Sequence, residues 1–417
     1  MKRVLMVAFH FPPLAVSSGI QRTLRFVQHL PLLGWQPIVL TAHPRAYERT
    51  GDDLLGEVPK DVVVEHAFAL DASRHLSVAG RYPGFMARPD RWLAWRLGAV
   101  PAGMRLIRRH RPDVLWSTYP IATAHIIGRA LQRASGLPWV ADFRDPMAQD
   151  GYPEDLRTWR SFKRIEERAL GNARFSVFVT PGAARMYRER YPALADRVAV
   201  IENGFDEESF ADLGTGADPG QALNPGAITL LHSGVVYPSE RDPTQLFAAL
   251  GEMVQSGALA STKLKIRFRA AAHEGLLQAL ARDSGVETLI ELLPPVPYRA
   301  ALEEMLRADG LLVLQAANCN EQIPAKLYEY LRTGRPIVAL TDPKGDTAAV
   351  LQEAGMNAIA RLDSPGEIAA LLGRFIADIR GKRAIVADPR YVARASRRER
   401  AAELAALLER ACTAARW

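Results

Sequence analysis

The segment 320–331 combines carboxylates and a lysine in a spacing that suits a phosphorylated, hydroxyl-rich ligand. It follows an apolar stretch, residues 310–314, that is typical of a buried strand. Pro324 suits the first position of a helix and Gly334 suits the residue just beyond its end. The pattern therefore predicts a helix over residues 324–333, whose N-terminus points beyond the carboxyl end of the preceding strand.

Lys326 falls in the first turn of this helix, where the helix dipole disfavours a cation unless an anion is bound nearby. Glu321 precedes the helix and Glu329 lies within it, so both carboxylates could border one pocket and accept hydrogen bonds from sugar hydroxyls. The alternative is a surface helix with ordinary solvated charges. The spacing alone fits both interpretations.

A second loop offers a close backbone approach to a phosphate. It joins a predicted strand, residues 4–8, to a predicted helix, residues 21–33, and it ends in Ser18 and Gly19. The three spaced glycines of a dinucleotide-binding fingerprint are absent, which argues against an oxidoreductase.

Length and composition predict two globular domains. The chain has 417 residues, of which 48% are hydrophobic and 24% charged. A net charge of +7 favours anionic ligands or an acidic membrane surface. The sequence has no compact basic tract, so we expect no binding to nucleic acid. Cys319 and Cys412 form neither a metal pattern nor a disulfide framework. With no leader and no long apolar span visible, we expect a cytoplasmic protein without a bound metal.

Strands and helices alternate along the chain, which is typical of doubly wound parallel sheets. The alternation pauses at residues 213–226, a stretch rich in Gly, Pro, Asp and Ala, and then restarts. We predict an α/β protein with a Rossmann-like domain at residues 1–206, a second at residues 207–390, and a C-terminal segment, residues 391–417, containing a helix over 391–415 that could pack back on the first domain. The predicted strands cover residues 4–8, 37–40, 62–64, 113–117, 139–141, 176–179, 228–232, 264–268, 288–292, 310–314 and 336–340.

Four motifs occur in order over nearly the whole chain, and each is weak alone. They are Phe11-Pro12-Pro13 with Ser18-Gly19, Ala141-Asp142-Phe143-Arg144-Asp145-Pro146, Ile201-Glu202-Asn203-Gly204-Phe205-Asp206, and the pair Glu321 and Glu329. Together they resemble the retaining, mainly bacterial family four of GT-B glycosyltransferases. The resemblance implies two Rossmann-like domains facing each other across a cleft, the first on the acceptor side and the second binding a nucleotide-sugar.

The resemblance also implies roles for the donor residues. Glu329 would hold the ribose hydroxyls, Glu321 would lie by the donor sugar, and Ser18-Gly19 would approach the diphosphate. The remaining donor-binding residues would be those of the connecting loop, Gln322, Ile323 and Pro324.

The chain departs from the family in its diphosphate contacts. Many members carry Gly-Arg after the first strand of the second domain, whereas this chain has Gly234-Val235. Arg241 falls near the position of a family lysine, so we assign the diphosphate, and the catalytic stabilisation of its charge, to Arg241 and Lys326. A surface role for Arg241 is the alternative.

His125 is the remaining catalytic candidate, because family members often have a cleft histidine near this position; a structural histidine is the alternative. Asp142, Arg144 and Asp145 follow a strand end and could line the acceptor side. They could equally form an internal ion pair that braces their loop.

Residues 91–111 alternate basic and apolar side chains and include Trp92 and Trp95. The segment could touch a membrane surface and approach a lipid-linked acceptor, as a peripheral contact at the inner face. Pro101 and Gly103 interrupt it, which predicts two short helices. Buried tryptophans beside solvated arginines are the alternative.

These observations favour a metal-independent, retaining glycosyltransferase that needs no cofactor beyond its nucleotide-sugar co-substrate. Its acceptor would be a glycan, a lipid-linked molecule or a small molecule, in polysaccharide or glycoconjugate synthesis. The alternatives are a GT-B sugar-nucleotide epimerase, which needs no acceptor, and a non-catalytic GT-B-like subunit.

Overall fold

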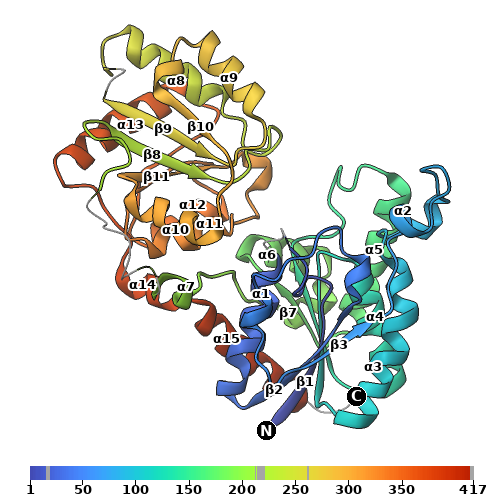
Figure 1. Ribbon diagram of the computed structural model, residues 1–417. Coiled ribbons are helices and arrows are strands. Elements are labelled where there is room, and N and C mark those ends of the chain that lie inside the picture. The colour runs from blue at the N-terminus through green and yellow to red at the C-terminus, as the bar shows by residue number, and fades with distance from the viewer. Residues whose placement is uncertain (16–18, 212, 214–220, 261–262, 414–417) are drawn as a thin grey trace. The chain divides into compact units, whose positions relative to one another are not determined.

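The computed structural model describes residues 1–15, 19–211, 213, 221–260 and 263–413, and the chain divides into two compact units. Unit 1 comprises residues 1–203 and 397–417, and unit 2 comprises residues 204–396. Each unit is a parallel sheet covered by helices on both faces (Figure 1). Ser18 and residues 214–220 of the predicted linker lie outside the described residues.

Unit 1 is built on a seven-stranded parallel sheet in the order β3-β2-β1-β4-β5-β6-β7. The strands are β1 (Lys2–Val7), β2 (Trp35–Ala42), β3 (Val63–Ala67), β4 (Val114–Thr118), β5 (Trp139–Arg144), β6 (Phe175–Phe178) and β7 (Val198–Val200). The α-helices are α1 (Gly19–His29), α2 (Ala72–His75), α3 (Arg96–His110), α4 (Thr123–Ser135), α5 (Leu156–Asn172), α6 (Pro181–Arg190) and α15 (Arg397–Thr413).

Alternation along β1 explains the two layers of helices. Leu5 and Val7 belong to the buried cluster that includes residues of α3, α4, α5 and α6, whereas Val4 and Met6 belong to the cluster that includes residues of α1 and α15. Successive side chains of a strand point to opposite faces, so a strand that is apolar at every position must be covered on both.

The C-terminal segment is two helices rather than the single helix predicted over residues 391–415. Helix α14 (Pro389–Arg394) belongs to unit 2 and α15 to unit 1, with a break at residues 395–396. At the break, the carbonyl of Ala395 accepts a hydrogen bond from the N–H of Phe205 (3.2 Å). The prediction failed because this contact, between residues far apart in sequence, uses a carbonyl that a continuous helix would need.

The prediction of two short helices over residues 91–111 is also wrong. After a 3₁₀ turn at Leu93–Trp95, α3 runs unbroken through Pro101 and Gly103. A Cβ on Gly103 would lie 2.7 Å from a methyl carbon of Leu131 on α4, so the glycine permits close packing of α3 rather than ending it. Trp95 has no exposed surface, whereas Trp92 is partly buried. Among the described residues, no helix has the length and apolarity needed to cross a membrane.

Unit 2 repeats the arrangement with six parallel strands in the order β10-β9-β8-β11-β12-β13. The strands are β8 (Ile228–Ser233), β9 (Leu264–Arg269), β10 (Ile290–Leu293), β11 (Gly310–Leu314), β12 (Ile337–Leu340) and β13 (Ile359–Ala360). The helices α8 (Thr244–Gln255), α9 (Glu274–Asp283) and α13 (Pro365–Arg380) contribute to one face. The helices α7 (Glu207–Ala211), α10 (Tyr298–Arg307), α11 (Lys326–Arg332), α12 (Asp346–Glu353) and α14 contribute to the other.

The predicted fold class is confirmed, and every strand predicted from the sequence overlaps an observed one. In unit 2 the strand order reverses between β8 and β11, because β8 pairs with β9 on one side and β11 on the other. Ligands of such sheets bind beyond the carboxyl ends of the strands at this switch point.

Candidate active site

Helix α11 begins beside the switch point of unit 2. Its first residue is Lys326, two residues later than predicted, because a tight turn precedes it: the carbonyl of Pro324 accepts a hydrogen bond from the N–H of Leu327 (2.9 Å). The predicted stop is confirmed, since Gly334 adopts a φ of 67°. Lys326 is thus the first helical residue and Glu329 lies in the same first turn.

The Lys326 ammonium is held by a histidine on the neighbouring strand. Lys326 Nζ lies 2.9 Å from His232 Nε2, and His232 Nδ1 lies 3.0 Å from the carbonyl oxygen of Leu312 on β11. That carbonyl can only accept, so Nδ1 carries the ring proton and Nε2 accepts from Lys326. Burial, together with Lys326, lowers the pKa of His232 well below its usual range, so the ring is neutral at pH 7.

A second cation lies near Lys326. Arg241 Nη1 donates to the carbonyl of Val235 (2.7 Å), which folds its guanidinium over the loop after β8. Burial and the charge of Arg241 lower the pKa of Lys326 well below its usual range. In the same loop Gly234 has a φ of 108°, and a Cβ there would lie 3.4 Å from Lys326 Nζ. Two cations gathered at a partly buried site repel each other, and an anion between them would relieve that repulsion.

Glu329 carries the carboxylate next to these cations. Its Oε1 accepts a hydrogen bond from the Tyr298 hydroxyl of α10 (2.7 Å). Its negative charge opposes the lowering of the Lys326 pKa, which places the two groups within electrostatic reach. A carboxylate has room for further donors, so ribose hydroxyls fit this position chemically.

The side chain of Gln315 holds the loop that carries Glu321 through hydrogen bonds. The Gln315 side chain, which is 3% exposed, donates to the carbonyls of Cys319 (2.6 Å) and Gln322 (2.8 Å) and accepts from the Thr347 hydroxyl (2.6 Å). The N–H of Gln322 bonds to the Cys319 carbonyl (3.0 Å), closing a turn with Glu321 inside it.

The loop contains three further predicted donor residues. Ile323 is buried, whereas Gln322 and Pro324 are partly buried. The donor roles of Glu321, Gln322, Ile323 and Pro324 remain predictions.

A cavity of about 620 Å³ opens at the same edge of unit 2 but has a different lining. Its walls come from the segments after β8, β11, β12 and β13, and include Asp242, Gln315, Lys344 and Arg361. Neither Lys326 nor Glu329 lines it, so the cavity and the cation cluster are separate features of the edge.

In unit 1, Gly19 opens α1 at a crowded point. A Cβ there would lie 2.4 Å from His10 Nδ1 and 3.1 Å from Arg144 Nη1, and the Gly19 carbonyl accepts a bond from that same Nη1 (3.1 Å). Burial and the charge of Arg144 lower the pKa of His10 to about 4. The side chains of His10 and Arg144 therefore occupy the space next to Gly19. Contact of Gly19 with a diphosphate remains a prediction.

Asp142 and Arg144 belong to a buried ion-pair network at the end of β5. Both carboxylate oxygens of Asp142 accept from the guanidinium of Arg22 on α1 (2.9 and 3.0 Å), and Arg144 Nε donates to the Thr118 hydroxyl (2.8 Å). Burial acts to raise the pKa of Asp142, but Arg22 and Arg144 outweigh it and hold that pKa below its usual value. This is the bracing arrangement named as an alternative, whereas Asp145 is exposed; acceptor contacts of the three remain predictions.

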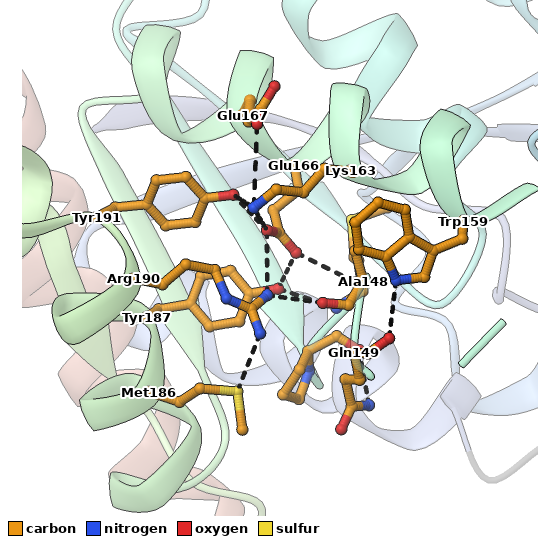
Figure 2. A network of polar contacts seen from close by, with 12 residues as sticks. Ala148, Gln149, Trp159, Lys163, Glu166, Glu167, Met186, Tyr187, Arg190 and Tyr191 are labelled. Carbon is orange, nitrogen blue, oxygen red and sulfur yellow. Dashed lines mark hydrogen bonds and ion pairs between the residues drawn. The ribbon is translucent and has the colours of Figure 1, made fainter. Parts of the chain in front are cut away.

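The loop that follows β5 is fixed by Glu166 of α5 (Figure 2). Glu166, which has no exposed surface, accepts from the hydroxyls of Tyr187 and Tyr191, from Arg190 and from the N–H of Ala148. The Tyr187 hydroxyl in turn accepts from the N–H of Met147 (2.9 Å). One carboxylate thus ties α5, α6 and the loop together.

His125 lies in the interior of unit 1. Its Nδ1 is 2.8 Å from the Ser117 hydroxyl, its ring centroid is 4.8 Å from that of Phe143, and it is 1% exposed. Burial lowers the pKa of His125 to about 4. Trp139 Nε1 donates to the same hydroxyl (2.9 Å), so that hydroxyl can donate to Nδ1. The catalytic role of His125 remains a prediction.

Two residues of this site were missed by the sequence reasoning. His232 stands near the carboxyl end of a strand at the switch point, which was a usable signal. Tyr298 offered none, because its contact with Glu329 joins the starts of two helices that only the packing of α10 brings near α11.

Comparison with known proteins places these features in a known context. Residues 19–209 match the model of the family described as Glycosyltransferase Family 4. Among curated proteins no sequence matches the chain.

Solved structures of similar fold include Anabaena HepE in complex with UDP, at 14% identity, a TM-score of 0.68, and 98% of this chain and 100% of that one covered. They also include sucrose-phosphate synthase from Thermosynechococcus elongatus, at 12% identity and a TM-score of 0.66, with 100% of each chain covered. A third is α,α-trehalose 6-phosphate synthase from Burkholderia multivorans, at 14% identity and a TM-score of 0.65, with 98% of this chain and 99% of that one covered.

Proposed function

We propose that the protein transfers a sugar from a UDP-sugar to an acceptor hydroxyl with retention of configuration, which is supported by the match of residues 19–209 to the model of glycosyltransferase family 4. The observation that carries the proposal is the cluster in unit 2, in which Lys326, Arg241 and Glu329 gather at the switch point of the sheet. The choice of UDP is supported by HepE, which has the same fold and was solved with UDP and with UDP-glucose.

Each member of the cluster has a chemical role in this proposal. Lys326 and Arg241 neutralise the diphosphate, whose negative charge grows as the bond to the sugar breaks. Glu329 accepts hydrogen bonds from the ribose hydroxyls, and Glu321 lies by the sugar. Lys326 is the better placed of the two cations, because its Nζ contacts His232 Nε2 and the neighbouring Gly234 has no side chain to crowd it.

The transfer step follows the front-face course implied by the family resemblance. The bond between the sugar C1 and the leaving phosphate oxygen breaks, and the acceptor oxygen bonds to C1 on the same face. The acceptor proton passes to an oxygen of the departing phosphate. The step needs no redox partner, and we propose that it needs neither a cofactor nor a divalent metal.

Acceptor and donor can be sought separately. A thermal-shift panel of nucleotide-sugars identifies the donor, because a ligand that binds the folded state raises the unfolding temperature. With that donor, release of UDP is measured against glycan, lipid-linked and small-molecule hydroxyl acceptors. Stabilisation by UDP-sugars with acceptor-dependent UDP release supports a transferase; conversion of the donor without acceptor supports an epimerase; binding with neither supports a non-catalytic subunit.

Metal independence is tested in the same assay. We expect transfer to persist in excess chelator, because the proposed diphosphate contacts are side-chain cations. Loss of transfer in chelator, with recovery on adding a divalent ion, would show that a metal neutralises the diphosphate instead.

A further inference from the structure

We propose that His232 is the positioning residue for Lys326, holding its Nζ at the diphosphate position of the donor through the Nε2 lone pair. The proposal rests on the donor role proposed above for this cluster. His232 itself touches no part of the donor in this scheme; it acts through Lys326.

The first argument is the tautomer. His232 has no exposed surface, and its two ring nitrogens are committed in opposite senses, Nδ1–H to the carbonyl of Leu312 (3.0 Å) and Nε2 to Lys326 (2.9 Å). The carbonyl belongs to β11, inside the sheet, so it cannot turn away. The sheet therefore orients the ring, and the ring presents a fixed acceptor to the lysine.

The second argument is the need for such an acceptor. A lysine has a flexible stem, and Lys326 stands in the first turn of α11 beside Arg241, where both the dipole and the like charge disfavour its ammonium. A neutral acceptor that faces Nζ favours the charged form and restricts its position at once. A hydrophobic side chain on β8 at residue 232 would provide neither effect.

The third argument is the surroundings of the Lys326 Nζ. Gly234 leaves the space next to Nζ open, at 3.4 Å from the position of a Cβ. The charges that act on Lys326 are those of Arg241, from the loop after β8, and Glu329, from α11. The charge of Arg241 also acts on two further titratable groups, Tyr330 of α11 and Cys319 of the loop after β11. Burial raises the pKa of Tyr330 and raises that of Cys319 to about 11, so neither side chain ionises between pH 7 and 9.5. Lys326 is the group of this set whose pKa is lowered, by burial and by the charge of Arg241.

The sign of the pH dependence follows. The pKa of Lys326 is lowered in the free protein, and only its ammonium attracts a diphosphate, so affinity for UDP is highest at low pH and declines as the pH rises through that pKa. At a pH where Lys326 is deprotonated in the free protein, UDP binding is then accompanied by proton uptake. The terminal phosphate of UDP, with a pKa near 6, is already ionised in this window.

Two variants separate the two ring nitrogens. In His232→Asn the side-chain amide can keep the bond to Leu312 but has no atom at the position of Nε2. In His232→Gln the amide oxygen can reach Lys326. We expect His232→Asn to weaken UDP binding at pH 7 by about tenfold or more and His232→Gln to stay within about threefold of the wild type, because a hydrogen bond to a charged group is lost only in the first.

The experiment is calorimetric titration of the full chain with UDP at several pH values between 7 and 9.5, with the unfolding temperature of each variant as a check on folding. We expect the decline in affinity to begin at a lower pH in His232→Asn, because Lys326 loses the acceptor that favours its charge. In His232→Gln we expect the decline to begin at the same pH as in the wild type. Titration in two buffers of different ionisation enthalpy measures the proton uptake.

The outcomes distinguish the two proposals. If UDP does not bind the wild type, the donor assignment falls. If UDP binds the wild type and folded His232→Asn equally, with the same pH profile, the positioning role of His232 is overturned and the donor assignment stands. An equal loss in His232→Asn and His232→Gln, with no change in pH profile, would mean that the histidine only fills space.

Discussion

At the scale of single residues, the proposed chemistry depends on three side chains of unit 2. Lys326 and Glu329 belong to the first turn of α11, and Arg241 reaches the same place from the loop after β8. The geometry gives Lys326 the firmest position of the three, since its Nζ meets a buried acceptor on the sheet. Substitutions at these residues therefore have distinct expected effects.

We expect Lys326→Ala to lower turnover at saturating UDP-sugar by about a hundred- to a thousandfold, and to lower it more than donor affinity, because the cation meets a charge that grows towards the transition state. Arg241→Ala should act in the same direction but more mildly, since its guanidinium is also bound to the Val235 carbonyl. Kinetics of UDP release measure both.

Lys344→Ala is the matched control for Lys326→Ala, because Lys344 is an exposed lysine at the same edge of the sheet. Near-normal turnover of Lys326→Ala would identify Lys326 as a surface charge with no part in the reaction.

We expect Glu329→Ala to weaken binding of UDP and of UDP-sugar together, by about ten- to a hundredfold, because charge-assisted hydrogen bonds to the ribose are lost from both ligands. Calorimetry on the folded variant measures the two affinities. Tyr298→Phe is the companion variant, since it removes only the hydroxyl that donates a hydrogen bond to Glu329. Unchanged affinity for UDP in Glu329→Ala would remove the ribose assignment.

At the scale of elements, buried polar groups hold loops in place at the carboxyl edge of unit 1. Asp142 links β5 to Arg22 of α1, and Glu166 links α5 and α6 to the loop after β5. Each is a carboxylate with no exposed surface whose donors come from more than one element. Such a network orders the loops, and removing one member leaves buried polar groups without a partner, which lowers the stability of the fold.

We expect Glu166→Ala to destabilise unit 1 by about 3–5 kcal/mol, because Tyr187, Tyr191 and Arg190 lose a common acceptor inside the protein. Hydrogen exchange should report the loss first at the N–H of Ala148, which bonds directly to Glu166 (3.2 Å). Glu167→Ala is the control, since Glu167 is the next residue, is half exposed and shares the partner Lys163. Equal exchange in the two variants would contradict a bracing role.

At the scale of the whole molecule, the chain returns to its first unit after completing the second. Residues 397–413 form α15, whose apolar side chains pack with α1 and with β1 in unit 1. Leu404, Leu407 and Leu408 are among its buried residues. Unit 1 is therefore a discontinuous fold that needs both ends of the described chain.

We expect Leu408→Ala to lower the stability of unit 1 by about 2–5 kcal/mol, because it deletes a fully buried side chain. Tryptophan fluorescence isolates this effect, since all seven tryptophans belong to residues 1–203 and 397–417. Leu372→Ala, an equally buried leucine in α13 of unit 2, is the control and should leave the fluorescence transition in urea where it is. A fluorescence transition that Leu408→Ala does not move would mean that α15 is dispensable for unit 1.

Local pattern determined much of this protein. Continuous apolar runs such as residues 310–314 predicted strands buried on both faces, and their alternation with helices predicted parallel sheets, as observed. The segment 320–331 also predicted an anion site, since a lysine in a first helical turn between two glutamates is a pattern of neighbours in sequence.

Tertiary structure decided what depends on partners distant in sequence. The break before α15 arises from a bond between Ala395 and Phe205, and the unbroken course of α3 arises from the fit of Gly103 against Leu131. Likewise Lys326 owes its place to His232, 94 residues earlier in the chain, and to the carbonyl that fixes that ring. Periodicity and propensity describe a segment and its neighbours, whereas these contacts exist only once the sheet has brought the strands together.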